Sequence, residues 1–121
     1  CTLTPSKEPV LEAAWVAPGT HINAVGACQP TEREISSGLM AVARVFGDAR
    51  ESVLKESCDF LTPLAEGLYG EDHLLGTLGG LLLGEAGRTS EDEITLFEAL
   101  GLAVEDIAAA KLVYEAACEA S

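Results

Sequence analysis

Residues 15–30 read Trp-Val-Ala-Pro-Gly-Thr-His-Ile-Asn-Ala-Val-Gly-Ala-Cys-Gln-Pro, and this stretch decides the fold. Pro18-Gly19 marks a turn, and the run from Thr20 to Val25 is short and partly β-branched, as in a buried strand. Its near-continuous apolar character is typical of a parallel strand covered on both faces. In an open α/β sheet, ligands lie beyond the carboxyl ends of the strands. The residues from Gly26 to Gln29 are therefore a candidate ligand edge, and the alternative is an ordinary exit from strand to loop.

Length and composition indicate one folded domain. The chain has 121 residues, 48% of them hydrophobic, which is enough for a core and too apolar for disorder. Its 7 basic and 20 acidic residues give a net charge of −13. Such an acidic protein repels phosphate backbones and anionic lipid headgroups, so we expect neither nucleic acid nor a membrane as a partner. No apolar run approaches the roughly 18 residues of a membrane span.

Four cysteines are spread widely along the chain: Cys1, Cys28, Cys58 and Cys118. They form no C-x-x-C pattern, and neither histidine lies at ligand spacing from them, so no metal site is predicted. A reduced, cytoplasmic setting is favoured over a disulfide framework. The sequence opens on Cys1 without an initiator methionine and in the middle of a strand-like run. We expect a fragment, a truncated reading frame or a leader that precedes this sequence.

The remaining elements follow from local patterns. Strands are expected at residues 1–4, 20–26, 43–46 and 93–97. Helices are expected to start at Pro9, at a capping box formed by Thr31 and Glu34, at Asp48, and at residue 61 for the segment 61–69. The leucine content of residues 71–87 suggests a buried helix, although its five glycines disfavour one. Short strands alternating with helices predict an α/β fold with a mainly parallel sheet.

A long helix is predicted from Gly101 to Glu119. Its small residues Ala103, Ala110 and Ala117 recur every seven positions and would allow a second helix to approach closely. The other apolar residues form a second stripe. This surplus of apolar surface predicts a partner, and the alternative is a core helix that is covered on two sides.

Four collinear segments resemble the ornithine cyclodeaminase/mu-crystallin family. They are Cys1-Thr2-Leu3-Thr4 with Ser6 and Pro9; Pro18 to Ala27 with Pro30 and Arg33-Glu34; Arg50-Glu51 with Leu54 to Ser57 and Asp59; and Thr95 to Phe97 with Gly101 to Asp106 and Ala108 to Ala110. Intact members of this family are dimeric NAD(P)-dependent proteins that include cyclodeaminases, amino-acid dehydrogenases and a ketimine reductase. The resemblance covers their carboxyl-terminal part. It implies a partial Rossmann-like fold, half of a doubly wound sheet with flanking helices and a long C-terminal helix, as a single truncated domain over residues 1–121.

The resemblance also assigns candidate site residues. Those of the nucleotide edge are Thr2, Thr4 and Ser6; those against the nicotinamide are Val25, Gly26 and Ala27; those toward the substrate are Cys28 and Gln29. Cys28 lies where cyclodeaminases carry a catalytic acid, and a thiol cannot replace a carboxylate in that role, so a reductase is the favoured parent. No G-x-G-x-x-G fingerprint is present, since Gly76 and the glycines after it do not join a predicted strand to a helix.

Three hypotheses follow. In the first, the chain is a truncated, non-catalytic family member that binds no cofactor alone and forms a homodimer through the edge at Cys1–Thr4 or the alanine face. In the second, it is a segment of a ketimine or imino-acid reductase that uses NADP or NAD. In the third, it is a small-molecule binding module at Gly26–Gln29.

Overall fold

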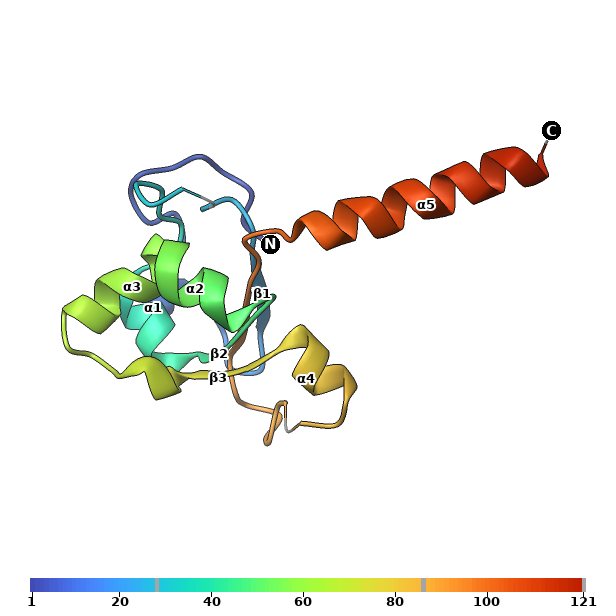
Figure 1. Ribbon diagram of the computed structural model, residues 1–121. Coiled ribbons are helices and arrows are strands. Elements are labelled where there is room, and N and C mark those ends of the chain that lie inside the picture. The colour runs from blue at the N-terminus through green and yellow to red at the C-terminus, as the bar shows by residue number, and fades with distance from the viewer. Residues whose placement is uncertain (28, 86, 121) are drawn as a thin grey trace.

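The computed structural model describes residues 1–27, 29–85 and 87–120, and a parallel four-stranded sheet lies at its centre (Figure 1). The strands are β1 (His21–Ala24), β2 (Arg44–Gly47), β3 (Leu74–Thr77) and β4 (Thr95–Glu98), in the order β1-β4-β2-β3. The last strand in the chain is thus a central one, since β4 pairs with β1 on one side and β2 on the other. The predicted α/β class and the strands expected at 20–26, 43–46 and 93–97 are confirmed.

The first residues of the chain lie beside β1. Thr2 forms a parallel bridge with Ala24, and its N–H donates to the carbonyl of Asn23 at 2.9 Å. The Thr2 carbonyl in turn accepts from the N–H of Val25 at 3.1 Å. The segment expected to end a strand therefore extends the sheet by a single bridge. Leu3, next to that bridge, is 69% exposed.

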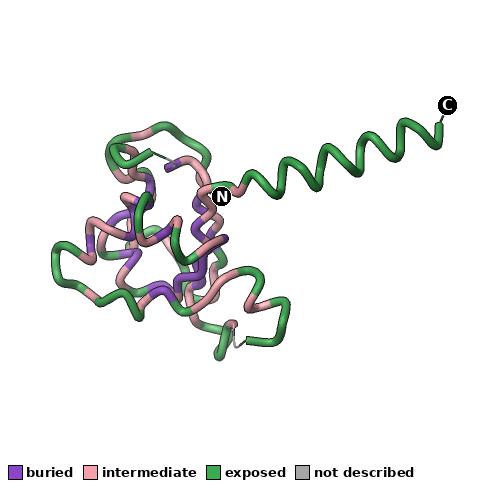
Figure 2. The backbone as a smooth tube through the Cα atoms, in the orientation of Figure 1, coloured by how far each residue is buried: buried purple, intermediate pink, exposed green. Residues whose placement is uncertain are grey.

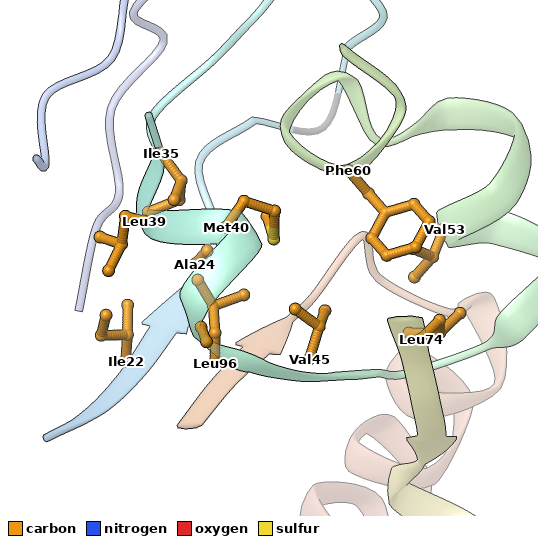
Figure 3. Packing of buried hydrophobic residues seen from close by; sticks show 11 residues of the cluster. Ile22, Ala24, Ile35, Leu39, Met40, Val45, Val53, Phe60, Leu74 and Leu96 are labelled. Atoms are coloured by element: carbon orange, nitrogen blue, oxygen red, sulfur yellow. The ribbon is translucent and has the colours of Figure 1, made fainter. Parts of the chain in front are cut away.

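Three helices cover one face of the sheet: α1 (Ser37–Val42), α2 (Arg50–Glu56) and α3 (Cys58–Ala65) (Figure 1). Alternate strand residues point toward them, and Figure 3 shows the resulting core. Its members include Ile22, Ala24, Val45 and Leu96 from the strands, and Leu39, Met40, Val53 and Phe60 from the helices. Burying each large side chain contributes about 1.5–3 kcal/mol, so this one layer carries most of the hydrophobic stabilisation.

The connection from β3 to β4 lies on the opposite face. The chain moves along the sheet from β1 through β2 to β3 and then returns to the centre, and a right-handed crossover in that direction needs the other face. The short helix α4 (Leu78–Leu82) occupies it, and its Leu81 shares a pocket with Phe46 of β2. The buried helix expected over residues 71–87 is wrong. A 3-10 turn (Glu71–His73), β3 and α4 stand there instead, because Leu74 completes the core as a strand residue. The expectation that Gly76 and the glycines after it do not join a strand to a helix is also wrong, since Gly76 lies in β3 and the next two glycines lie in α4.

The predicted capping box is also wrong. Helix α1 begins at Ser37, and the hydroxyl of Ser36 caps it by accepting from the N–H of Leu39 at 3.3 Å. Glu34 lies outside the helix and is fully buried. Its carboxylate is engaged by residues distant in the sequence, so a tertiary contact displaces the local capping interaction.

Three other helix starts differ from expectation. No α-helix starts at Pro9, because the N–H groups of the two following residues both donate to the Glu34 carbonyl, at 2.8 and 3.0 Å, and a 3-10 turn follows only at Ala13–Trp15. Helix α2 forms as expected, but Ala49 is its N-terminal cap residue, in place of Asp48. The turn expected over 61–69 belongs to α3, which starts earlier because the Ser57 hydroxyl accepts from the N–H of Phe60.

The final helix α5 (Ala103–Glu119) extends away from the rest of the molecule (Figure 1). It is exposed along its whole length, as Figure 2 shows. Five large apolar side chains on it are 65–70% exposed: Val104, Ile107, Leu112, Val113 and Tyr114. The predicted long helix is confirmed, and the alternative of a covered core helix is wrong for this chain, since no residue of α5 is buried. Within the described residues, no helix combines the length and apolarity needed to cross a membrane.

Candidate functional site

The carboxyl ends of the parallel strands meet at one edge of the sheet, which holds the candidate site. Strand β1 leads into Val25, Gly26 and Ala27, and the segment from Thr2 to Thr4 runs alongside. Strand β4 ends there at Glu98. This is the edge at which open parallel sheets bind ligands, because side chains and loops from different strands converge beyond it.

Glu34 joins the two sides of this edge. One carboxylate oxygen accepts from the N–H of Thr4 at 2.5 Å, and the other accepts from the N–H of Gly26 at 2.8 Å. Burial opposes the charge on Glu34, but hydrogen bonding by the Thr2 side chain, by Thr4 and by the Gly26 backbone outweighs it and holds the pKa of the carboxyl below its ordinary value. Glu34 is therefore ionised at neutral pH and forms two charge-assisted hydrogen bonds.

The contact with Glu34 also explains the glycine that ends β1. A Cβ added at Gly26 would overlap the backbone N and O of Thr4 and would lie 2.6 Å from a carboxylate oxygen of Glu34. Only glycine lets these three groups approach so closely. The glycine is thus required by the packing of the chain on itself, and a ligand is not needed to account for it.

Asp59 holds the backbone from which Glu34 projects. Its Oδ1 accepts from the N–H groups of Glu34 and Ile35, each at 2.9 Å, and Oδ2 lies 3.2 Å from the N of Glu34. Asp59 comes from the first turn of α3 and is completely buried. Burial raises the pKa of Asp59 to about 6, although the two N–H groups favour its charged form. At neutral pH the Asp59 carboxyl is therefore mostly ionised.

Glu98 is a third buried carboxyl group near this edge. It is 1% exposed, and its Oε1 accepts from the Ser57 hydroxyl at 2.7 Å. Among the described residues, its Oε2 has no hydrogen-bond partner. Burial, together with repulsion from Asp59, raises the pKa of Glu98 to about 8. Glu98 consequently holds its proton at neutral pH, beside two carboxyl groups that are charged.

Asp48 connects the segments that follow the neighbouring strands β2 and β4. Its Oδ2 accepts from the N–H groups of Leu100 and Gly101, at 2.8 and 2.7 Å, just after β4. Its Oδ1 accepts from the N–H of Ala49 at 2.6 Å. The residue therefore fixes the point at which the chain leaves the sheet toward α5, a role that explains why it does not cap α2 through its side chain.

The structure brings most of the predicted site residues to one place. Thr2, Thr4, Val25, Gly26 and Ala27 all lie at the edge described above. Ala27 is buried, and Thr4 is exposed.

The other two predicted residues that the structure describes, Ser6 and Gln29, lie in the loops beyond this edge. The Ser6 hydroxyl turns back to the Glu8 carbonyl at 2.6 Å, and Gln29 is exposed at the start of the following loop. Cys28, predicted to face the substrate, lies outside the described residues.

Sequence reasoning missed the tertiary roles of three of the buried acids, Glu34, Asp59 and Glu98. The sequence pattern places Glu34 in a helix cap and Asp59 within a family motif, and it indicates no role for Glu98. The available signal was weak: Glu34 stands directly before the apolar Ile35, and Glu98 directly after the apolar strand run. Acidic residues in such positions are buried only when distant partners satisfy them, and a single sequence does not show those partners.

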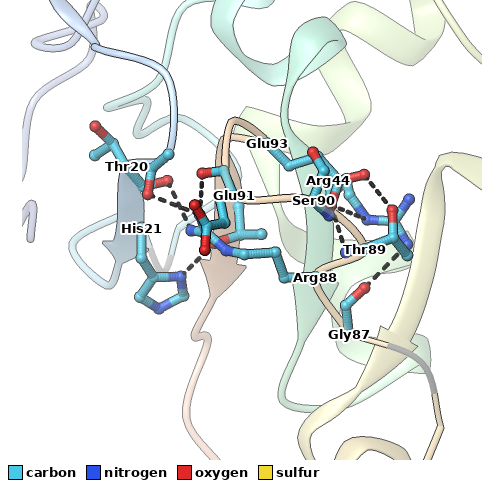
Figure 4. Close-up of polar contacts among 11 residues, drawn as sticks. Thr20, His21, Arg44, Gly87, Arg88, Thr89, Ser90, Glu91 and Glu93 are labelled. Atoms are coloured by element: carbon cyan, nitrogen blue, oxygen red, sulfur yellow. Dashed lines mark hydrogen bonds and ion pairs between the residues drawn. The ribbon is translucent and has the colours of Figure 1, made fainter.

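A second polar cluster lies at the opposite, amino-terminal ends of the strands (Figure 4). The Arg88 guanidinium donates to the carbonyls of Gly19 and Glu91, at 2.8 and 3.0 Å, and to the Thr95 hydroxyl at 3.1 Å. An open pocket of about 340 Å³ adjoins it, lined by His21, Phe46, Leu81, Gly87, Arg88 and Thr95. Because the guanidinium is engaged by carbonyl groups, the cluster fastens the loop before β4 to the turn before β1.

Comparison with known proteins identifies relatives over almost the whole chain. The sequence model of the ornithine cyclodeaminase/mu-crystallin family matches residues 1–121. The ketimine reductase mu-crystallin of Mus musculus is 46% identical over 114 residues, which are 94% of this chain and 34% of that protein.

Solved structures of related proteins have the same fold over almost the whole chain. The Δ1-pyrroline-2-carboxylate reductase of Thermococcus litoralis, in complex with NADH and L-proline, superposes with a TM-score of 0.92 at 41% identity, covering 97% of this chain and 36% of that one. An archaeal alanine dehydrogenase dimer with bound NAD gives a TM-score of 0.88 at 38% identity, covering 97% and 37%. The chain thus spans about a third of the length of these relatives.

Proposed function

The chain belongs to the ornithine cyclodeaminase/mu-crystallin family, and we propose that it forms the nicotinamide side of the nucleotide site of an NAD(P)-dependent imino-acid reductase. Relatives with this activity in their names support the proposal, as do similar structures that contain NADH or NAD. The predicted family and the Rossmann-like sheet are confirmed by the same comparisons. Residues 1–121 then represent the second half of a nucleotide-binding domain followed by its last helix.

The observation that carries the proposal is the joined edge at Thr4 and Gly26. Two segments distant in sequence are held side by side at the carboxyl ends of the strands, where such a sheet binds a dinucleotide. The residue types fit the group. Hydroxyl groups of Thr2 and Thr4 suit a ribose or phosphate, and Val25 and Ala27 present small apolar groups suited to a nicotinamide ring.

When bound, the nicotinamide supplies the hydride, and the protein supplies position and electrostatics. In this proposal the main chain from Val25 to Ala27 orients the ring, and the buried Glu34 keeps that main chain in place. The exposed Gln29 offers a carboxamide toward the substrate side. Cys28 is assigned to the same side by the resemblance alone. None of these groups is assigned a catalytic role.

A second proposal concerns the chain alone. We infer that it is non-catalytic by itself, binds no cofactor tightly, and self-associates as a dimer. The exposed Leu3 beside the single-bridge edge and the uncovered apolar residues of α5 support this, because both surfaces are of the kind that proteins bury. Sedimentation at micromolar concentration is expected to show a dimer, and a monomer would refute the inference. The cytoplasmic location and small-molecule binding at Gly26–Gln29 stay predictions.

A chimera tests the reductase proposal. The matching segment of the Thermococcus litoralis reductase is replaced by residues 1–121, and NADH binding and reduction of Δ1-pyrroline-2-carboxylate are measured. We expect a folded chimera that binds NADH and reduces the substrate, while the chain alone shows no binding by calorimetry. A folded chimera that does not bind NADH overturns the proposal. The reductase lacking this segment is the matched control.

A further inference from the structure

We infer that Glu34, itself held by Asp59, is a positioning residue that sets the spacing between the nucleotide segment at Thr4 and the nicotinamide loop at Gly26. This inference rests on the proposed function, because it assigns the two sides of the edge to two parts of one dinucleotide. Its structural half, the clamp itself, can be tested on the chain alone.

The geometry of the clamp is specific to a carboxylate. Each oxygen of Glu34 accepts one N–H, and the two donors come from opposite sides of the edge. An amide side chain has one acceptor oxygen, so it would satisfy one donor and present its own NH₂ to the other. The shorter side chain of aspartate would not span both donors. Glutamate is therefore the residue that joins Thr4 to Gly26 from this backbone position.

Burial of Glu34 restricts the motion of its carboxylate and makes the loss of either hydrogen bond destabilising. Glu34 has 0% of its surface exposed, and a buried carboxylate is tolerated only where hydrogen bonds compensate the loss of water. Water does not readily replace either donor at such a site. The Thr2–Ala24 bridge already pairs the two segments. Beyond that bridge, the Glu34 carboxylate sets the separation of Thr4 and Gly26.

Asp59 extends the clamp to the helical layer. By accepting the N–H groups of Glu34 and Ile35, it fixes the main chain from which the clamping carboxylate projects. The line of contacts therefore runs from the first turn of α3 through Asp59 and Glu34 to Gly26. Groups that bind a ligand are most effective when a rigid second layer fixes their position, and a displacement of about 1 Å can abolish productive geometry.

Hydrogen exchange of the Thr4 and Gly26 amides tests the clamp. In E34Q, at least one of these amides is expected to lose protection about tenfold relative to the core amides of Val45 and Leu96, since a charge-assisted hydrogen bond is lost. Normalising to core amides separates local opening from global destabilisation. Equal protection of both edge amides in E34Q and wild type overturns the inference. If E34Q does not fold, E34D is measured in its place under the same criterion, since it keeps the charge and shortens the reach.

The matched control is E93Q. Glu93 also accepts two backbone N–H groups, from Thr89 at 2.7 Å and Ser90 at 3.3 Å, but it lies before β4 at the other end of the sheet. E93Q is expected to leave the Thr4 and Gly26 amides unchanged.

The role of Asp59 is tested by substitution and rescue. D59A is expected to reproduce the loss of protection at Gly26, and D59N to restore most of it, because the asparagine oxygen can still accept both N–H groups. Unchanged protection in D59A would overturn the part of the inference that concerns Asp59.

Cofactor kinetics then connect the clamp to the proposed function. In the chimera, E34Q is expected to raise KM for NADH about tenfold with a smaller change in kcat, and E93Q to leave KM within about twofold. A wild-type chimera that binds no NADH refutes the reductase proposal. A wild-type chimera that binds NADH, beside an E34Q chimera that binds it equally well, refutes the positioning role of Glu34. The two failures are thus distinguishable.

Discussion

Replacing Glu98 by glutamine is expected to stabilise the protein at neutral pH. Glu98 is buried beside Asp59, and its pKa is raised from 4.5 to about 8 by burial and by neighbouring carboxyl groups. The folded protein therefore keeps a proton that the unfolded chain releases above about pH 4.5. Glutamine has nearly the shape of the protonated side chain, can still accept from the Ser57 hydroxyl, and never ionises.

The magnitude follows from the linkage between protonation and folding. The contribution of protonated Glu98 to the free energy of unfolding is complete below pH 4.5. It is lost as the pH rises through about 8, at about 1.4 kcal/mol per pH unit. At about pH 7, Glu98 alone lowers the free energy of unfolding of the wild type by about 3 kcal/mol relative to its value near pH 4.5. E98Q escapes this loss, so it is expected to be more stable by about that amount at neutral pH and nearly equal to wild type close to pH 4.5.

Urea unfolding from about pH 5 to about pH 9 measures the effect. The wild-type free energy of unfolding is expected to fall more steeply with pH than that of E98Q. The variant E105Q, on the exposed helix α5, serves as control and is expected to follow the wild-type curve. Parallel curves for wild type and E98Q, or an E98Q that is less stable at neutral pH, would show that Glu98 is not held protonated by the fold.

Three further predictions concern packing and association. G26A is expected to destabilise the chain by about 1–3 kcal/mol, because its methyl group would overlap Thr4, and a denaturation midpoint equal to wild type would contradict this. S57A is expected to cost about 1–2 kcal/mol in urea unfolding, since it removes both the cap of α3 and the donor to Glu98. Deleting residues 102–121 is expected to change the free energy of unfolding of the remaining domain by less than about 0.5 kcal/mol while shifting the chain toward monomer in sedimentation. A large loss of stability would show that α5 packs on the domain.

Local patterns predicted the elements whose signals are local. Strand β1 is a short apolar run between Pro18-Gly19 and Gly26, and α5 is a long alanine-rich stretch after Gly101, so both could be located from the sequence. Strand β3 could not, because its Leu-Leu-Gly-Thr run sits among glycines and leucines that fit no single period. Its strand conformation is decided by pairing with β2.

The residues of the candidate site also fall into those that the sequence predicts and those that it does not. The resemblance to a family placed Thr4 and Gly26 at one edge, and the structure brings them together. The acids that hold this edge were missed because their partners are remote: Glu34 reaches Thr4 across 30 positions, and Asp59 reaches Glu34 across 25. The same Glu34 satisfied a local capping pattern, and the tertiary contact prevailed because it compensates a buried charge.

The most direct measurement of the central claim is a crystal structure of the chimera with NADH and L-proline, the pair present in the Thermococcus litoralis structure. We expect the nicotinamide ring to lie within about 4 Å of the main chain from Val25 to Ala27, with Glu34 still hydrogen-bonded to Thr4 and Gly26. A nicotinamide bound elsewhere, for example in the pocket beside His21 and Arg88, would contradict the claim that the carboxyl edge is the nucleotide site.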